Sequence, residues 1–386
     1  MEGGGFVSEG GYGCTYYPEI SCSGKETSNK NFLSKIQLND DSAKNEIKIS
    51  KLLKQALSSN ELNEHFAPVI SSCQIDLNEL EIGEMDKCSH IKKAEGSDFI
   101  LMKIKYIDGR LLDKFFIEES NSAFILRIFI HSFKHLLKSI QLLNKAKIVH
   151  NDLKNSNILF DEKKLSPLII DFGLSIPIDQ INSENIKYYF YIYAPDYYMW
   201  PLEIHILNYY LHINEDFSLE ELKNIVNSYV DGFQILKAFS PQFKENYRKL
   251  CLEVAKKYLN LPKKIFLKKI LTKWNTWDSY ALSVEFIKLT YILLNVSENQ
   301  IIANNFSEFI VTLLIYGIHP DPKERFSIEK MIELFNQFLL EQETESIEEI
   351  SDLILKNKKM ISKKLKDSVK LSKKMSKRIS RRKVKI

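Results

Sequence analysis

Apolar residues recur every three or four positions along several stretches of this chain, the spacing that gives a helix one buried face. The longest stretch, 121–147, predicts a long buried helix. Residues 41–57 predict a shorter one, with Asp41 or Ser42 as its N-cap. The repeated apolar positions of the longer helix are Ile125, Ile128, Phe129, Phe133, Leu136, Leu137, Ile140 and Leu143.

Short apolar runs of strand length lie around these two helices. Residues 32–36 form such a run, residues 99–109 contain another, and residues 158–160 with 168–170 predict a hairpin.

The segment 204–277 carries helix-start signals. Ser218 and Glu221 form a capping box, Ser240 precedes a proline that starts a second helix, and Pro262 starts a third. Two interpretations stay open for this segment, a structural pad or a docking surface for a substrate or partner.

The composition is that of a packed globular protein. The 386 residues are 44% hydrophobic and 11% aromatic, which suits two or three lobes with a sizeable core. The longest apolar runs, such as 309–318, have about half of the ~20 residues that a membrane span needs. The N-terminus lacks a signal-peptide pattern. We therefore expect a soluble intracellular protein without a transmembrane segment.

Five cysteines occur along the chain, and no two of them have Cys-x-x-Cys spacing. They are Cys14, Cys22, Cys73, Cys88 and Cys251. An odd number without metal-ligand spacing predicts a reducing compartment, no disulfide framework and no zinc site.

The net charge of +4 conceals a strong asymmetry. Residues 355–386 carry fifteen Lys and Arg against one acid, Asp367, so this tail has a net charge of +14 and the first 354 residues one of −10. Charge of this density attracts polyanions through counterion release, and nucleic acid is the expected partner. The alternatives are a nuclear-import signal, an anionic membrane surface, or a solvated tail without a partner.

The most informative chemistry lies between residues 150 and 173. Its polar set, in chain order, is Asp152, Lys154, Asn157 and Asp171. Phosphoryl transfer needs such a set: an acid to accept the hydroxyl proton, a cation on the moving phosphate, and two oxygen ligands for Mg²⁺. The stretch 150–157, followed by Asp171-Phe172-Gly173, resembles the catalytic and metal loops of protein kinases, H-R-D-L-x-x-x-N and D-F-G.

This resemblance implies a two-lobed α+β protein-kinase fold that uses ATP and Mg²⁺. It makes Asp152 and Lys154 catalytic, and it makes Asn157 and Asp171 the metal ligands. The implied lobes are 1–107 (small sheet with one helix) and 108–345 (mainly helical, including 204–277). Residues 346–386 would be a basic tail, either disordered or helical.

Further parts of the kinase pattern occur upstream in the right order. A glycine-rich turn would cradle the phosphates, a strand lysine paired with a helix glutamate would hold the nucleotide, and three later residues would contact the adenine. By the resemblance these residues are Gly10, Gly11 and Gly13, then Lys35 and Glu46, then Lys105, Ile107 and Leu159.

Three residues downstream also match the pattern. Glu203, in Trp-Pro-Leu-Glu, resembles the glutamate that ends an activation segment, and Arg325 resembles the arginine that pairs with it. Asp278 resembles the aspartate that anchors the catalytic-loop backbone.

The chain departs from the kinase pattern at the activation segment. Asn151 replaces an arginine that meets a loop phosphate in regulated kinases. Residues 174–203 contain six tyrosines and no threonine, although the family typically uses a threonine there to bridge the catalytic aspartate and lysine. Activity without activation-loop phosphorylation is therefore expected.

The glycine-rich turn, the catalytic loop and the long insertion together resemble serine/threonine kinases of large nucleocytoplasmic DNA viruses, of the iridovirus, asfarvirus and giant-virus groups. This finer resemblance implies a viral protein of the host cytoplasm or the virion, with nuclear import through the tail as an alternative.

We therefore expect an ATP- and Mg²⁺-dependent kinase that phosphorylates serine and threonine hydroxyls of protein substrates. One alternative is a pseudokinase scaffold that binds partners through residues 204–277 and the tail. Another is a small-molecule kinase of related fold, which the Glu203 and Arg325 matches disfavour.

Overall fold

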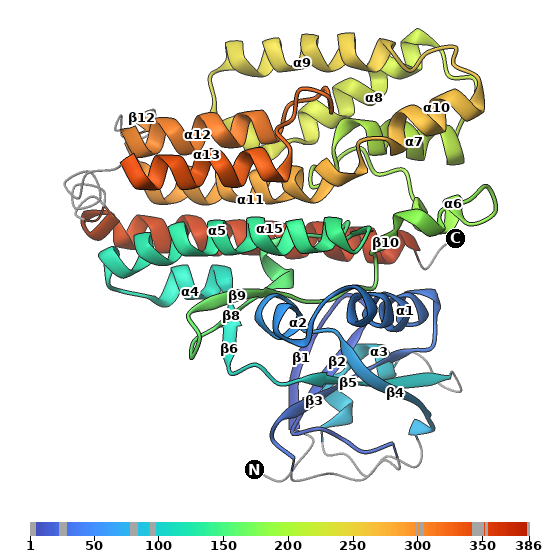
Figure 1. Cartoon of the computed structure of the whole chain (residues 1–386), viewed down its shortest axis with the longest axis vertical. Helices are drawn as coiled ribbons and strands as arrows, with labels where there is room; N and C mark the ends of the chain where they lie inside the picture. The colour runs from blue at the N-terminus through green and yellow to red at the C-terminus, as the bar shows by residue number, and fades with distance from the viewer. Residues whose placement is uncertain are drawn as a thin grey trace.

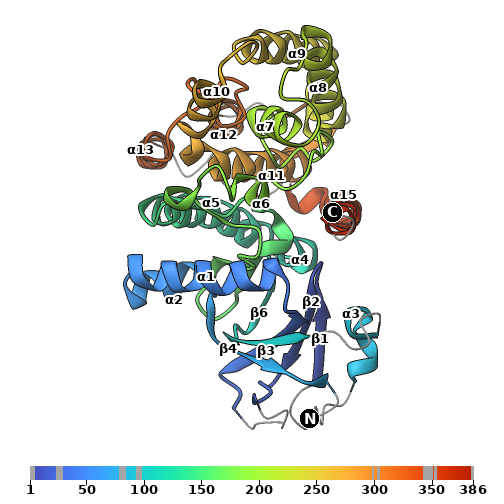
Figure 2. The same cartoon turned by 90° about the vertical axis from the view of Figure 1, so that its right-hand side faces the viewer.

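Strands gather in the first third of the chain and helices in the rest, so the molecule consists of a small lobe and a large lobe (Figure 1, Figure 2). The computed structural model describes residues 5–22, 29–77, 84–92, 98–297, 300–301, 305–341, 351 and 354–383. This architecture is the two-lobed α+β fold that the sequence predicts.

The small lobe is a five-stranded antiparallel sheet of order β1-β2-β3-β5-β4. Its strands are β1 (Gly5–Glu9), β2 (Gly13–Tyr17), β3 (Phe32–Leu38), β4 (Val69–Ile75) and β5 (Phe99–Lys105). Helices α1 (Asp41–Ala56) and α2 (Ser59–His65) lie between this sheet and the large lobe (Figure 1). The N-cap of α1 is Asp40, whose carboxylate accepts from the Ala43 amide at 2.9 Å, so the sequence-based cap at Asp41 or Ser42 was one or two residues late.

The large lobe is organised around α5 (Ser122–Lys145), which matches the long helix predicted over 121–147. All eight of the predicted apolar positions are buried in it, because their spacing keeps them on the inward face. Among the described residues no helix is long and apolar enough to span a membrane. The other large-lobe helices outside the insertion are α4 (Leu112–Glu118), α6 (Ile186–Tyr189), α11 (Trp277–Leu294), α12 (Asn305–Gly317) and α13 (Ile328–Glu341).

Small strand pairs bring the functional loops to the boundary between the lobes. The predicted hairpin is present as β8 (Ile158–Asp161) and β9 (Ser166–Ile169), extended by β6 (Gly109–Leu111). A second pair joins β7 (Ile148–Val149) to β10 (Ile176–Pro177). The chain between β7 and β8 is the loop that the sequence predicts to be catalytic, and the chain from β9 to β10 carries Asp171.

The insertion folds as helices packed on the large lobe, far from the small lobe (Figure 1). Its helices are α7 (Leu202–His212), α8 (Leu219–Gly232), α9 (Pro241–Lys256) and α10 (Lys263–Leu271). The predicted capping box of Ser218 and Glu221 is present at the start of α8. Two buried hydroxyls fix the insertion to the lobe: Tyr229 bonds Tyr280 on α11 at 2.6 Å, and Tyr247 donates to the Ile318 carbonyl at 2.8 Å. These contacts favour the structural-pad interpretation.

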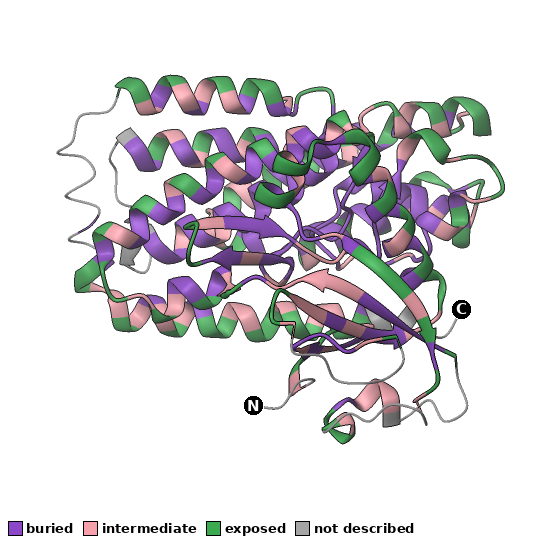
Figure 3. Ribbon diagram, turned by 60° about the horizontal axis from the view of Figure 1, so that its bottom comes forward, coloured by how far each residue is buried: buried purple, intermediate pink, exposed green. Residues whose placement is uncertain are grey.

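The basic tail forms one long helix, α15 (Lys358–Lys383), beside the large lobe (Figure 2). Its apolar positions Ile361, Leu365 and Ile379 are buried, and its other face is largely exposed (Figure 3). Lys358 and Ser362 each donate a 3.0 Å hydrogen bond to a carbonyl at the end of α4, those of Phe116 and Ile117. Of the two tail states that the sequence left open, the described part is helical.

The expectation of no disulfides is wrong. Cys14 is bonded to Cys88 and Cys22 to Cys73, and both bonds lie in the small lobe. Cys251 is buried and free, in α9. The partners are 74 and 51 residues apart in sequence, so no local spacing pattern predicts either bond.

Candidate active site

A lysine of the small lobe meets two carboxylates where the lobes face each other. Strand β3 presents Lys35, whose Nζ lies 2.7 Å from Glu46 Oε2 on α1 and 3.1 Å from Asp171 Oδ1. Burial would lower the pKa of Lys35, but Asp171 and Glu46 outweigh it and raise that pKa. Burial opposes the charge of Asp171 too, yet Lys35 holds the pKa of that carboxyl below its ordinary value. A charged lysine next to a charged carboxylate results.

Helix α1 is held in this position by the segment that follows Asp171. Asn45 donates to the carbonyls of Gly173 at 3.1 Å and of Ser175 at 2.8 Å. A Cβ at position 173 would lie 2.6 Å from Ser42 Oγ, so any larger residue there would force Ser42 to move. These contacts join α1 to the segment after Asp171 and so keep Glu46 facing Lys35.

The catalytic loop holds Asp152 at the centre of a buried polar cluster. Lys154 Nζ lies 2.9 and 2.7 Å from its two carboxylate oxygens, and Asn157 Nδ2 donates to Oδ2 at 3.0 Å. Asp278, at the start of α11, accepts from the backbone amides of His150 at 2.7 Å and Asn151 at 3.0 Å. The predicted anchoring role of Asp278 is confirmed. This anchor holds the loop where Asn151 takes a left-handed φ of 63°.

One side chain in this cluster was not among the sequence-predicted site residues. The Tyr197 hydroxyl donates to Asp152 Oδ1 at 2.5 Å, from the activation segment. The signal that could have suggested it was the absence of threonine between residues 174 and 203, in a segment with six tyrosines.

Asn157 and Asp171 fit a divalent cation. The amide nitrogen of Asn157 is committed to Asp152, donating to its carbonyl at 2.9 Å, so its Oδ1 is the atom left for a ligand. An amide oxygen and a carboxylate are the hard oxygen ligands that Mg²⁺ takes in nucleotide sites, together with phosphates. No cluster of three or more His, Cys, Asp or Glu suited to a metal occurs among the described residues. A two-ligand site completed by phosphate is consistent with that.

The glycine-rich turn joins β1 to β2. Gly10 N donates to Gly13 O at 2.8 Å, closing the turn, and Gly10 and Gly11 are exposed at its tip. A Cβ on Gly13 would lie 2.4 Å from the Ile36 carbonyl, so only glycine fits beside β3.

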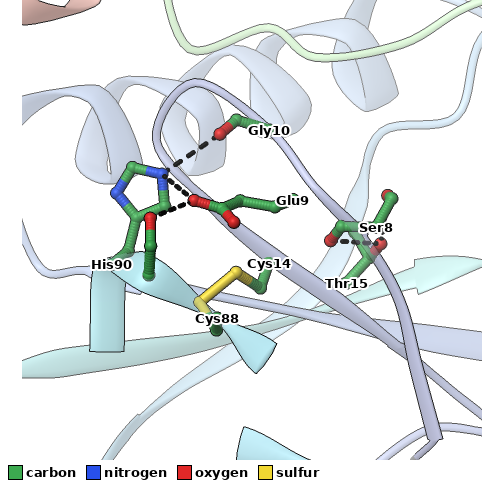
Figure 4. The surroundings of a disulfide bond; sticks show 8 residues. Ser8, Glu9, Gly10, Cys14, Thr15, Cys88 and His90 are labelled. Carbon is green, nitrogen blue, oxygen red and sulfur yellow. Dashed lines mark hydrogen bonds and ion pairs between the residues drawn. A yellow bond between two sulfur atoms is a disulfide. The ribbon is translucent and has the colours of Figure 1, made fainter. Parts of the chain in front are cut away.

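The segment 84–92, called the clasp below, is attached to the turn and its two strands by three consecutive residues (Figure 4). Cys88 is bonded to Cys14, Ser89 Oγ donates to Glu9, and the His90 ring nitrogen Nε2 lies 3.1 Å from the Gly10 carbonyl. Sequence reasoning missed this clasp entirely.

The three residues expected around the adenine lie where the chain passes from the small lobe to the large lobe and on the adjacent strand β8. Lys105 ends β5, Ile107 is buried just beyond it, and Leu159 is half-buried in β8 opposite Leu111. The structure brings Lys35, Glu46 and Asp171 into direct contact, and Asp152, Lys154 and Asn157 into a second cluster. Within the described part of the chain, the adenine residues form no side-chain bond with either group.

The predicted pair of Glu203 and Arg325 is confirmed. Arg325 donates to both carboxylate oxygens, at 2.6 and 2.7 Å, and both side chains are 1% exposed. Trp277 Nε1 also donates to Glu203, at 3.1 Å, and Arg325 Nε donates to the His319 carbonyl at 2.7 Å. The pair is buried and fully hydrogen-bonded, as a structural pair must be.

A comparison with protein families agrees with this geometry: residues 9–339 match the protein kinase domain. The chain belongs to the protein kinase family, because the match covers most of its length.

Shorter stretches are similar to individual kinases. The chain is 29% identical over 111 residues to the dual specificity protein kinase zakA of Dictyostelium discoideum, covering 28% of this chain and 14% of that protein. It is 36% identical over 81 residues to the carbon catabolite-derepressing protein kinase of Saccharomyces cerevisiae, covering 21% and 12%. It is 40% identical over 47 residues to the rat (Rattus norvegicus) mitogen-activated protein kinase kinase kinase 8, covering 12% and 10%. The chain thus spans only a small part of the length of these relatives.

Proposed function

We propose that this protein transfers the γ-phosphate of ATP to serine and threonine hydroxyls of proteins, with Mg²⁺ held by Asn157 and Asp171. The observation that carries the proposal is the pair of contacts of Lys35, at 2.7 Å to Glu46 and 3.1 Å to Asp171, beside an intact Asp152 cluster. A pseudokinase scaffold would have no use for both sets. The lysine two residues after Asp152 is typical of serine/threonine kinases and favours that specificity.

Each residue has a role that follows from its position. Lys35, fixed by Glu46, binds the nucleotide phosphates. Asp152 orients the substrate hydroxyl and takes its proton, and Lys154 offsets the charge that develops on the transferred group. The cation supplies charge neutralisation on the phosphates. Positioning and electrostatics account for most of the rate in such a site.

The test is Asp152→Asn, which should abolish transfer and leave nucleotide binding intact, because Asp152 does not hold the nucleotide. Asp171→Ala should lose the Mg²⁺-dependent part of nucleotide binding. Asp179→Asn removes an exposed carboxylate of the activation segment and is the matched control. Near-full turnover by Asp152→Asn would show that the catalytic role is assigned to the wrong residue.

We also propose that the kinase is active without phosphate on its activation segment. The activation segment contacts α1 without a phosphate: Tyr188 donates to the Asp41 carbonyl at 2.7 Å, and Lys48 donates to the Tyr189 hydroxyl at 3.1 Å. Asn151, which replaces the receptor arginine, bonds the Leu174 carbonyl at 3.4 Å. Phosphatase-treated protein should keep its activity. A large drop in activity that maps to Ser175, Ser183 or a segment tyrosine would contradict this.

A second proposed activity is polyanion binding by α15, with nucleic acid as the partner. The exposed positions of α15 repeat every three or four residues and are nearly all basic, so they form one cationic stripe. The stripe consists of Lys359, Lys363, Lys366, Lys370, Lys373, Lys374, Lys377 and Arg378. The apolar face of the helix is already packed on the large lobe, which disfavours insertion into a membrane and leaves charge as the means of recognition.

The stripe can be tested without removing the helix. Changing Lys363, Lys366, Lys373 and Lys374 together to Gln should weaken retention of DNA and RNA. The salt slope of binding should become shallower by about one for each phosphate that the variant no longer neutralises. The control changes four exposed insertion lysines, Lys237, Lys249, Lys264 and Lys268, to Gln. Equal weakening in both variants, or binding to anionic vesicles alone, would contradict a nucleic-acid role for α15.

The finer assignment to large DNA viruses, with its host-cytoplasm or virion location and import through the tail, is also a proposal. It is supported by the motif combination at the glycine-rich turn, the catalytic loop and Trp200-Pro201-Leu202-Glu203, followed by the 74-residue segment 204–277. Immunodetection of the protein in purified particles and in fractions of infected cells would test it.

A further inference from the structure

The carboxylate of Asp152 accepts four hydrogen-bond contacts from three groups, as many contacts as its lone pairs accept. Oδ1 receives the Tyr197 hydroxyl at 2.5 Å and Lys154 Nζ at 2.9 Å. Oδ2 receives Lys154 Nζ at 2.7 Å and Asn157 Nδ2 at 3.0 Å. A substrate hydroxyl therefore reaches Asp152 only where one of these donors gives way.

Tyr197 is buried and packed against Trp200, a residue that is itself hydrogen-bonded to the catalytic loop. Its side chain is 3% exposed, and its ring packs edge-on against Trp200 with centroids 4.9 Å apart. Trp200 in turn donates from its amide to the Tyr197 carbonyl at 3.2 Å and from Nε1 to the Asn151 carbonyl at 2.7 Å. The phenol is thus fixed to the same loop that carries Asp152.

Lys154 differs from Tyr197 because the proposed function gives it another partner, the transferred phosphate. Asn157 would bind the cation through its Oδ1, so its Nδ2 stays on Asp152. The shorter contact of Lys154, 2.7 Å, is with Oδ2, so its move to the phosphate opens a place on Oδ2, while the Tyr197 hydroxyl stays on Oδ1.

We propose that Tyr197 is a positioning residue that holds Oδ1 of Asp152 and presents Oδ2 to the substrate hydroxyl. This proposal rests on the proposed kinase function and deepens it. The phenol donates to Asp152 from residues 174–203, a segment that contains no threonine.

The group-transfer step assigns each atom a place. The substrate oxygen forms a bond to the γ-phosphorus, and the bond from that phosphorus to the β,γ-bridging oxygen breaks with its electron pair on the leaving diphosphate. The hydroxyl proton passes to Oδ2. Tyr197 keeps its own proton throughout, because burial, and next to it the Asp152 charge, hold the pKa of Tyr197 well above its usual value.

The deciding variant is Tyr197→Phe, which removes only the hydroxyl. Its matched control is Tyr198→Phe, which removes a hydroxyl from the adjacent buried tyrosine, whose ring stacks on Phe233. In single-turnover assays Tyr197→Phe should lower the transfer rate about 10- to 100-fold, as removal of a supporting hydrogen bond does elsewhere. KM for ATP should not change, and Tyr198→Phe should match the wild type in both constants.

A second readout does not depend on activity. In protein labelled at the tyrosine ring carbon that bears the hydroxyl, the NMR signal that Tyr197→Phe removes should move in Asp152→Ala and stay in place in Asp179→Asn. It should also fail to titrate at pH values where exposed tyrosines do, near 10.

The outcomes separate the two proposals. A wild-type protein that phosphorylates no protein substrate would overturn the kinase function and the positioning role with it. An active wild type with an unimpaired Tyr197→Phe would overturn the positioning role alone. A Tyr197 signal that ignores Asp152→Ala would do the same. Lower thermal stability with an unchanged rate would make Tyr197 purely structural.

Discussion

Two ion pairs of similar geometry lie in different parts of this molecule, and their surroundings differ. Arg325 and Glu203 are 2.6 Å apart, each 1% exposed, and surrounded by further protein donors and acceptors. Lys35 and Glu46 are 2.7 Å apart, but Lys35 also contacts Asp171, whose side chain is 32% exposed. The Arg325–Glu203 pair, whose hydrogen bonds are all made within the protein, is structural. The Lys35–Glu46 pair, which adjoins a partly exposed carboxylate, is arranged for a ligand.

The largest expected effect is that of Lys35→Met. Transfer should fall by roughly 10³-fold, since a preorganised cation on the phosphates is removed. Stability should change little, because burial already raises the pKa of Glu46 and lets it become neutral once Lys35 is gone. The measurements are the single-turnover rate and the urea unfolding curve.

Lys44→Met, an exposed lysine of α1, is the control for this variant and should change neither quantity. A Lys35→Met protein that unfolds much more easily would make the Lys35–Glu46 pair structural too and remove the contrast.

The buried pair should respond in the opposite way. Arg325→Met should cost about 3–5 kcal/mol of unfolding free energy, since it leaves the Glu203 charge buried without its partner. The folded fraction, assayed at low temperature, should transfer phosphate at the normal rate. Adding Glu203→Gln to Arg325→Met should recover part of the stability, because the orphaned charge is gone. Unchanged urea unfolding in Arg325→Met would contradict the structural role.

A smaller effect is expected for the clasp on the glycine-rich turn. Replacing Cys14 and Cys88 by Ser should lower the unfolding free energy of the small lobe by about 2–4 kcal/mol. KM for ATP should rise because the turn is less fixed. The matched control is the Cys22 and Cys73 double replacement, which removes the other bond of the same lobe.

Thiol labelling tests the pairing itself. In unfolded, unreduced protein only Cys251 should react. Reaction of all five thiols in protein purified without reductant would show that the bonds do not form.

The candidate catalytic set was predictable because each of its members lies in a short motif whose spacing matches the kinase pattern. Asp152, Lys154 and Asn157 lie within six residues, and Asp171 precedes Phe172-Gly173. The Glu203–Arg325 pair and the Asp278 anchor were found in the same way, from neighbours in sequence that mark their places in the pattern.

Contacts that depend on the path of the chain were not predictable. Tyr197 meets Asp152 across 45 residues, and six tyrosines in its segment look alike in sequence. The two disulfides join distant cysteines without a spacing signal. In the tail, the many lysines obscure a helical pattern of apolar residues. Ile361, Leu365 and Ile379 lie on one face of α15, and this face packs on the large lobe.

The docking of α15 has a consequence for biosynthesis. Lys358 caps the carbonyl of Phe116, a partner made 242 residues earlier. At about 5–20 residues per second, the ribosome completes α15 on the order of tens of seconds after it completes α4. During that interval the surface that α15 later shields is exposed to other nascent chains. A chaperone that occupies this surface is therefore expected to release the large lobe only after α15 has been synthesised.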